Sequence, residues 1–161
     1  MRTTRNTRVE DYLIISGFIN DWWGGRQMAG MLPRLFFEHF QPTSFIMEEE
    51  GEIVAFLVGF LSQTNPGEAY IHFVGVHPDK RKSGLGHELY QLFFKEVAQR
   101  GCHTVRCITS PVNKGSIQFH TRLGFEMEEG DKQVDGIAVT SNHAGEGQDR
   151  VTFVKSIAAL P

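Results

Sequence analysis

The chain has 161 residues, of which 40% are hydrophobic and 22% are charged, and its formal net charge is −3. This length can bury one core but is short for two ordinary domains, so we expect a single domain over residues 1–161. The spread-out, slightly negative charge argues against nucleic acid as a partner. No long apolar run predicts a membrane span, and the polar segment 1–8 does not resemble a secretory signal. We therefore expect a cytoplasmic protein that binds no membrane.

Two helices are predicted in the first quarter of the chain. Thr7 and Glu10 have the spacing of a capping box, which predicts a helix from about residue 8 to residue 20. Apolar residues at helical spacing from 28 to 39 predict a second amphipathic helix, whose regular part would begin near Pro33.

Strands are predicted next, where apolar and β-branched residues cluster. The apolar runs at 43–47 and 53–61 are joined by the acidic, glycine-containing residues 48–52, which suit an exposed hairpin turn. A third strand at 70–76 follows the turn-forming residues 65–67.

The second half alternates between helical and strand patterns. We expect a helix at 84–100, a strand at 104–109, a helix at 114–123, a short strand from Phe125, a long surface loop at 130–149 and a closing strand at 151–157. This order predicts an α/β (α+β) fold with a mixed sheet covered by helices.

Cysteine and histidine spacing predicts neither a disulfide nor a metal site. Cys102 and Cys107 are an odd number of positions apart on one expected strand, so their side chains should point to opposite faces. The seven histidines lack the paired spacing of metal ligands, and we predict no metal.

The most informative segment is the basic run Arg81-Lys82-Ser83-Gly84-Leu85-Gly86, which follows the strand at 70–76. Apolar residues recur every fourth position from Leu85 to Val97, so the run opens a helix. Unpaired amides in a first helical turn and the positive end of the dipole favour a phosphate there, and glycine lets it approach. Glycine also serves ordinary turns, and the run lacks the spacing of nucleoside-triphosphate and dinucleotide loops.

Two blocks of sequence resemble one family. Arg81 to Gly86, preceded by Val76-His77-Pro78, resembles the acyl-CoA pyrophosphate loop Q/R-x-x-G-x-G/A of the GNAT N-acetyltransferase superfamily. Residues 113–125 fit N-x-x-S-I-x-x-H-x-x-x-G-F, which resembles the fourth helix and following strand of these enzymes, with a histidine similar to that of phosphinothricin-like acetyltransferases. The resemblance implies a mixed, mostly antiparallel central sheet of about six to seven strands flanked by about four helices.

The resemblance also implies that acetyl-CoA is the acetyl donor, with its pyrophosphate on residues 82–86. Its pantetheine arm would run back along the strand ending at Val76 and approach Asn113, although asparagine at this place also serves as a helix cap. The residues implied to bind the donor are Val74, Val76, Arg81, Lys82, Ser83, Gly84, Leu85, Gly86, Asn113 and Ser116.

Gly75 interrupts a strand of bulky residues, which indicates a bulge or a close backbone approach. In GNAT enzymes this strand donates an amide hydrogen bond to the thioester carbonyl, and such a donor is typically worth about 3 kcal/mol. The alternative is a glycine retained for packing.

His72 is the first catalytic candidate, because the acceptor amine must lose a proton before it can attack. Residues two apart share a strand face, so Tyr70 and His72 should line one side together with the valines at 74 and 76. The position resembles that of the histidine base in arylalkylamine-type GNAT enzymes. A partly buried histidine held by a carbonyl is an equal alternative, and Glu38 and Asp21 are weaker candidates.

His120 is the second catalytic candidate. Many GNAT enzymes place a tyrosine acid after the phenylalanine of the fourth helix, but here Phe119 is followed by His120. With a pKa near 6.5 its imidazolium would be about a quarter populated at pH 7, and the neutral ring could still hydrogen-bond the sulfur.

The acceptor site is implied to lie at the junction of the first two helices, with the loop at 130–149 able to fold over it. The predicted substrate-binding residues are Asp21, Trp22, Trp23 and Tyr70. Two tryptophans beside a carboxylate could surround a cationic amine. Adjacent tryptophans point in different directions, so the alternative is that at least one belongs to the core.

The resemblance implies an acetyl-CoA-dependent N-acetyltransferase that acts in a ternary complex on a primary amine of a small molecule, an amino acid or a peptide. A non-catalytic acyl-CoA sensor or interaction module is the alternative, favoured by the missing tyrosine. A homodimer is the tendency of the family.

Overall fold

The computed structural model describes residues 1–158, and contacts between residues divide the chain into two compact units. The first unit comprises residues 1–61 and 71–97, and the second comprises residues 62–70 and those from 98 onward. The single domain expected over residues 1–161 stays a prediction.

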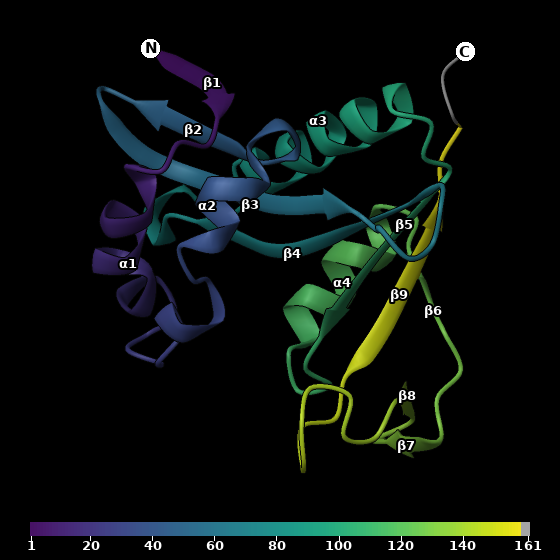
Figure 1. Cartoon of the computed structure of the whole chain (residues 1–161). Coiled ribbons are helices and arrows are strands. Elements are labelled where there is room, and N and C mark those ends of the chain that lie inside the picture. The colour runs from purple at the N-terminus through teal and green to yellow at the C-terminus, as the bar shows by residue number, and fades with distance from the viewer. Residues whose placement is uncertain (159–161) are drawn as a thin grey trace. The chain divides into compact units, whose positions relative to one another are not determined.

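Seven strands form one sheet in the order β1-β2-β3-β4-β5-β9-β6 (Figure 1). They are β1 (Arg2–Asn6), β2 (Phe45–Glu49), β3 (Glu52–Leu61), β4 (Glu68–Val76), β5 (Thr104–Thr109), β6 (Glu126–Met127) and β9 (Val151–Ser156). The β4–β5 pair is parallel, whereas β1–β2, β2–β3, β5–β9 and β6–β9 are antiparallel. With the helices α1 (Asp11–Trp22), α2 (Leu35–His39), α3 (Leu85–Gln99) and α4 (Lys114–Arg122), the expected mixed, mostly antiparallel α/β fold is confirmed.

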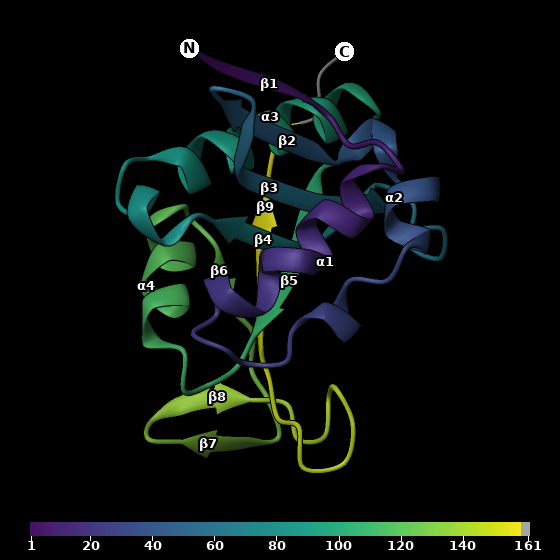
Figure 2. The same cartoon turned by 90° about the vertical axis from the view of Figure 1, so that its left-hand side faces the viewer.

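In the first unit, α1 and α2 lie on one side of β2, β3 and β4, and α3 lies on the other side (Figures 1 and 2). Burial explains this arrangement. Ile15 and Ile19 are one turn apart on α1, are at most 1% exposed, and share a core cluster with Phe56 of β3 and Phe73 of β4. On α3, the predicted every-fourth-residue face is buried, from Leu85 to Val97.

In the second unit, α4 packs against the strands β6 and β9. His120 on the buried face of α4 stacks on Phe153 of β9, and its ring edge meets Phe125 just before β6. Cys107 is a buried free thiol on β5, whereas Cys102 is a buried free thiol that precedes the strand, so the expectation of one shared strand is wrong.

The predicted capping box at Thr7 and Glu10 is wrong. Helix α1 begins at Asp11, no side chain caps it, and the buried Thr7 hydroxyl has no hydrogen-bond partner among the described residues. Instead the Asp11 carboxylate, which is 2% exposed, accepts the amide of Arg8 at 2.7 Å and two guanidinium hydrogen bonds from Arg5 at 2.8 and 2.9 Å. The start of this helix is therefore fixed by the ion pair between Arg5 of β1 and Asp11, and not by a cap from the Thr7 hydroxyl as the local spacing predicted.

The predicted helix at 28–39 is also wrong over most of its length. It resolves into a 3₁₀ turn at Ala29–Met31 and the short helix α2. Glycine and proline in this segment disfavour a continuous helix, and Asn20 holds the chain differently. Its side-chain oxygen accepts the amides of Met28 and Ala29 at 2.7 and 3.0 Å.

Most other elements are confirmed to within about two residues, with two exceptions. The edge strand β1 was not predicted, because a polar edge strand reads as a polar tail. The expected loop at 130–149 contains a hairpin of β7 (Lys132–Val134) and β8 (Ile137–Val139). Its turn, Asp135-Gly136, has positive φ at both residues and is a strong hairpin signal that the loop assignment overlooked.

Candidate functional site

The loop at 81–86 has the geometry of an anion cradle. Lys82 and Gly84 have φ values of 65° and 86°, and Leu85 then begins the 15-residue helix α3. A Cβ atom built on Gly84 would meet nothing within 4 Å, so the space beside its backbone is open. In the part of the chain that the structure describes, the amides of residues 82–86 donate no hydrogen bond to backbone outside the helix. Such amides, at the positive end of a helix dipole, can hold a phosphate.

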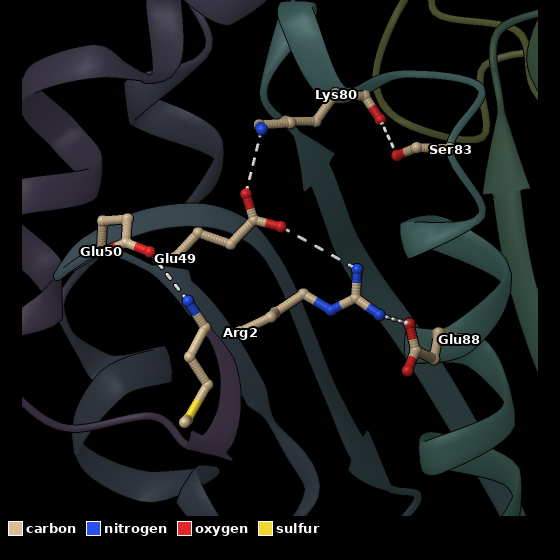
Figure 3. Close-up of polar contacts among 7 residues, drawn as sticks. Arg2, Glu49, Glu50, Lys80, Ser83 and Glu88 are labelled. Atoms are coloured by element: carbon tan, nitrogen blue, oxygen red, sulfur yellow. Dashed lines mark hydrogen bonds and ion pairs between the residues drawn. The ribbon is translucent and has the colours of Figure 1, made fainter.

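Ion pairs tie both flanks of this loop to the edge of the sheet (Figure 3). Nζ of Lys80, before the loop, lies 3.0 Å from Oε2 of Glu49 on β2. Oε2 of Glu88, in the first turn of α3, lies 3.0 Å from Nη2 of Arg2 on β1. Arg2 also faces Glu49 at 3.9 Å. The hydrogen bond from Lys80 lowers the pKa of Glu49. Ser83 donates its hydroxyl to the Lys80 carbonyl, which closes the loop on itself.

The side chain of Arg81 points back into its own unit. Its Nε donates to the carbonyl of Val76 at 3.3 Å, and its Nη2 donates to the carbonyl of Trp22. The guanidinium therefore joins the loop to the ends of β4 and α1. No local pattern in the sequence signals this link, because Trp22 is distant along the chain.

Strand β4 shows the expected two-sided pattern. Tyr70, His72 and the valines at 74 and 76 are partly exposed, and the residues between them are buried, so their shared face is confirmed. Gly75 lies on the buried face, where an added Cβ would come within 2.5 Å of Phe56 and 3.1 Å of Trp23. These contacts favour the packing explanation for the glycine.

His72 is held by Met31, which lies between α1 and α2, and by Phe36 of α2. Its ring stacks on Phe36 at 4.2 Å with an interplanar angle of 4°, and its Nε2 lies 2.6 Å from the carbonyl oxygen of Met31. A carbonyl only accepts, so Nε2 carries the hydrogen and Nδ1 carries the lone pair. Burial lowers the pKa of His72, and the bond to Met31 opposes that shift. His72 is thus held by a carbonyl, as the alternative in the sequence analysis expected, and its Nδ1 lone pair is not used by that hydrogen bond. Neither Phe36 nor Met31 was predicted to contact it.

The motif of the second unit is organised around α4. Asn113 accepts the amide of Ser116 at 3.0 Å and so caps the helix. His120 Nδ1 lies 2.7 Å from the Ser116 carbonyl oxygen, and the residue is 6% exposed. Burial lowers the pKa of His120, with the bond to Ser116 opposing, so the imidazolium is scarcer at neutral pH than the sequence suggested.

In the same unit, burial and the nearby Cys107 raise the pKa of Tyr70 to about 12. Burial also raises the pKa of the Cys107 thiol. Both groups therefore keep their protons at neutral pH.

The two tryptophans of the predicted acceptor site have different surroundings. Trp22 is 5% exposed, and its ring stacks on that of Phe18 with the centroids 4.2 Å apart. It therefore belongs to the core, in agreement with the alternative that at least one of the two tryptophans does. Trp23 is partly exposed and its ring packs 5.0 Å from Phe73 of β4. Asp21 is exposed. The structure thus brings Trp23, but not the Trp22 ring, to a position where a ligand could touch it.

The described residues offer neither a metal site nor a helix that could span a membrane. Within residues 1–158, no cluster of three histidine, cysteine, aspartate or glutamate side chains could hold a metal ion. None of the helices described combines the length and apolar character needed to cross a membrane.

Comparison with known proteins supplies the family. The model of the Acetyltransferase (GNAT) family matches residues 13–125, which is more than half of the chain. The chain belongs to the GNAT family. The predicted family is therefore confirmed, and acetyl-CoA is the acetyl donor that this family uses.

Curated relatives of this GNAT chain match over a limited stretch. It is 42% identical over 67 residues to an L-2,4-diaminobutyric acid acetyltransferase of Virgibacillus pantothenticus, covering 40% of this chain and 42% of the relative. It is 33% identical over 84 residues to a mycothiol acetyltransferase of Kytococcus sedentarius, covering 52% of this chain and 28% of the relative. The chain thus spans less than half the length of these relatives.

Solved GNAT structures share the fold at low identity. A GNAT-family protein of Desulfovibrio desulfuricans has a TM-score of 0.80 at 16% identity, covering 98% of this chain and 100% of that chain. The acetyltransferase yncA of Salmonella typhimurium, solved with its cofactor acetyl-CoA, has a TM-score of 0.69 at 19% identity, covering 96% and 93%. A ribosomal-protein-alanine N-acetyltransferase of Brucella melitensis has a TM-score of 0.69 at 17% identity, covering 96% and 99%.

Proposed function

We propose that this GNAT chain is an N-acetyltransferase that moves an acetyl group from acetyl-CoA directly to a primary amine of a small molecule, an amino acid or a peptide, in a ternary complex. One observation carries the proposal: the backbone amides of residues 82–86 form an open cradle at the start of a long helix, and a Cβ added to Gly84 within it would meet nothing within 4 Å. A diphosphate suits this cradle, because amides and dipole offer it positive charge without a side chain in the way. Acetyl-CoA supplies an activated acetyl thioester there.

The residues of β4 would serve the acetyl end. We assign His72 as the base, acting through Nδ1, because Nε2 is committed to the Met31 carbonyl. A lowered pKa keeps the ring neutral at pH 7, which leaves the lone pair available to take a proton from the acceptor ammonium. Val74 and Val76 on the same partly exposed face would line the pantetheine arm.

The residues of the second unit would serve as hydrogen-bonding groups. Tyr70, with its pKa raised to about 12, would act as a hydrogen-bond donor to the acceptor and not as a base. His120 would act as a neutral ring and not as an imidazolium acid, because burial lowers its pKa. Asn113 and Ser116 stay predicted donor-binding residues, and they hold the start of α4.

The acceptor would meet Trp23 and Asp21 at the end of α1. Trp23 offers a partly exposed indole face and Asp21 an exposed carboxylate, which together suit a cationic amine. The names of the relatives supply two probes, L-2,4-diaminobutyrate and a peptide that begins with alanine. A cytoplasmic location and a homodimer stay predictions.

The test combines binding and turnover. Calorimetry should find acetyl-CoA binding to the wild-type chain, and Gly84→Glu should weaken it at least tenfold, because a carboxylate would enter the cradle and because the φ of 86° strains any side chain at this position. A panel of amines that includes the two probes should then release CoA thiol. Unchanged affinity in Gly84→Glu would refute the cradle. Tight binding without thiol release across the panel would favour the acyl-CoA sensor.

A further inference from the structure

The last carbonyl of α1 is bound by a residue from far along the chain. Helix α1 ends at Trp22 and has no basic side chain in its last turn. The final carbonyls of a helix lack partners within it and carry the negative end of its dipole, so they favour a cation. Nη2 of Arg81 supplies that cation to the Trp22 carbonyl.

The same guanidinium also binds the end of β4. Its Nε donates to the carbonyl of Val76, the last residue of the strand, at 3.3 Å. Arg81 itself is extended, with φ −65° and ψ 150°, and leads directly into the cradle. One side chain therefore links the anion-binding loop, the end of β4 and the end of α1.

The residue after Trp22 stands against β4 where the acetyl group is proposed to lie. The Trp23 ring packs 5.0 Å from Phe73 and is within 3.1 Å of the position of a Cβ on Gly75. A shift of the Trp22 carbonyl would move the Trp23 ring with it, because the two residues share a peptide unit.

We propose that Arg81 is a positioning residue that couples occupancy of the loop to the placement of Trp23, and that its side chain is not a phosphate ligand. The inference rests on the proposed binding of a diphosphate by residues 82–86. Two of the guanidinium donors already serve carbonyls, and the fork geometry of arginine lets one side chain hold two acceptors at once. Lys82, which belongs to the loop itself, supplies a cationic side chain for the phosphates in this proposal.

Coupling of this kind is reciprocal. A diphosphate on the amides orders the loop and hence the Arg81 bonds, and an ordered Trp23 in turn favours the loop conformation that binds the diphosphate. Removing the link should therefore weaken CoA binding about fivefold without removing a charge contact to phosphate. It should also raise the acceptor KM at saturating acetyl-CoA by a similar factor, with kcat changed less than twofold.

Tryptophan fluorescence gives a direct readout, because the chain has two tryptophans and both lie at this junction. CoA should change the emission of the wild-type chain, and Trp23→Phe should remove most of that change. In Arg81→Ala, calorimetry should still find binding, weakened about fivefold, while the emission change is lost. Arg81→Lys should behave like Arg81→Ala, because an ammonium cannot hold both carbonyls in the guanidinium geometry.

Salt dependence separates positioning from phosphate contact. Arg81 adjoins residues 82–86, so Arg81→Ala removes a positive charge from within a Debye length of the loop whatever the role of the side chain, and the informative variant is Arg81→Lys, which keeps the charge. A positioning role predicts weakened CoA binding in Arg81→Lys with a salt slope parallel to wild type. Arg8→Ala, which removes an exposed positive charge from the same unit, is the matched control and should keep wild-type affinity and emission.

The outcomes are distinguishable. If wild-type chain does not bind CoA by calorimetry, the proposed function fails and this inference fails with it. If wild type binds CoA but Arg81→Lys retains wild-type affinity, or Arg81→Ala keeps the full emission change, only the role of Arg81 is overturned. Thermal unfolding of each variant shows that it is folded.

Discussion

Replacing Gly75 by alanine tests whether packing or the acetyl donor requires the glycine. The added Cβ would lie 2.5 Å from Cε1 and 2.7 Å from Cζ of Phe56, and 3.1 Å from Cη2 of Trp23. Carbon atoms in contact prefer about 3.5–4.0 Å, so the Phe56 ring must move by about 1 Å. Phe56 is fully buried in the cluster that α1 shares with β3 and β4, and it has little room to do so.

The expected loss of stability follows from two opposing terms. Overpacking a dense core costs about 1–3 kcal/mol, and replacing glycine by alanine recovers about 0.4–1 kcal/mol by restricting the unfolded chain. Gly75→Ala should therefore lower the free energy of unfolding by about 1–2 kcal/mol. For a chain of this size that corresponds to about 2–8 °C in Tm.

The assay is urea unfolding followed by tryptophan fluorescence, with calorimetric titration of acetyl-CoA. Gly17→Ala is the matched control, because a Cβ there meets nothing within 4 Å and the residue is exposed on α1. It should raise the free energy of unfolding by about 0.5–1 kcal/mol. Adding Phe56→Leu to Gly75→Ala should relieve part of the clash, with a coupling of about 1 kcal/mol.

The reasoning is refuted if Gly75→Ala is as stable as wild type. If Gly75→Ala is as stable as wild type and loses thiol release while it keeps acetyl-CoA affinity, the glycine is required for the close approach of the donor to the strand.

Three other changes test the start of α1 and the buried histidine of α4. Thr7→Val should leave the free energy of unfolding in urea unchanged or raise it by up to about 1 kcal/mol, because the lost hydroxyl has no partner among the described residues; a loss above about 1 kcal/mol would show a missed bond. Asp11→Ala should cost about 2–4 kcal/mol in the same assay, because Arg5, whose pKa that carboxylate raises, keeps only Glu48 as an anionic partner and the Arg8 amide loses its acceptor; Arg5→Met on that background should recover part of the loss. His120→Gln should flatten the dependence of stability on pH. The folded pKa of His120 lies below 6.5, so the unfolded chain binds more protons as pH falls below about 6.5, and wild-type stability drops there. Equal losses between pH 7.5 and pH 5.5 in wild type and variant would contradict the burial of this ring.

The parts of the fold that sequence could predict are those with local signals. The loop at 81–86, the helix after it and the strand at 104–109 follow from glycine placement and from periodicity, and their bounds are close to those observed. The start of α1 could not be predicted in the same way, because its anchor is an ion pair between Arg5 on β1 and Asp11. The hairpin turn at 135–136 did carry a local signal.

In the candidate site, too, the features with a local signal could be predicted from the sequence and those that depend on tertiary contacts could not. The face of β4 that carries His72 follows from the two-residue period of a strand, and the structure keeps it. The partners of that ring, Met31 and Phe36, come from a segment whose path depends on Asn20 side-chain bonds. The bonds of Arg81 to carbonyls of α1 and β4 depend on tertiary packing as well, and its motif position alone implied only a residue that binds the donor.

The most direct test of the central claim is the structure of this chain crystallised with acetyl-CoA. We predict that the diphosphate oxygens lie within hydrogen-bond distance of the backbone amides of residues 82–86, beside the open backbone of Gly84. A diphosphate bound elsewhere on the chain, with these amides facing solvent or a side chain, would contradict the account.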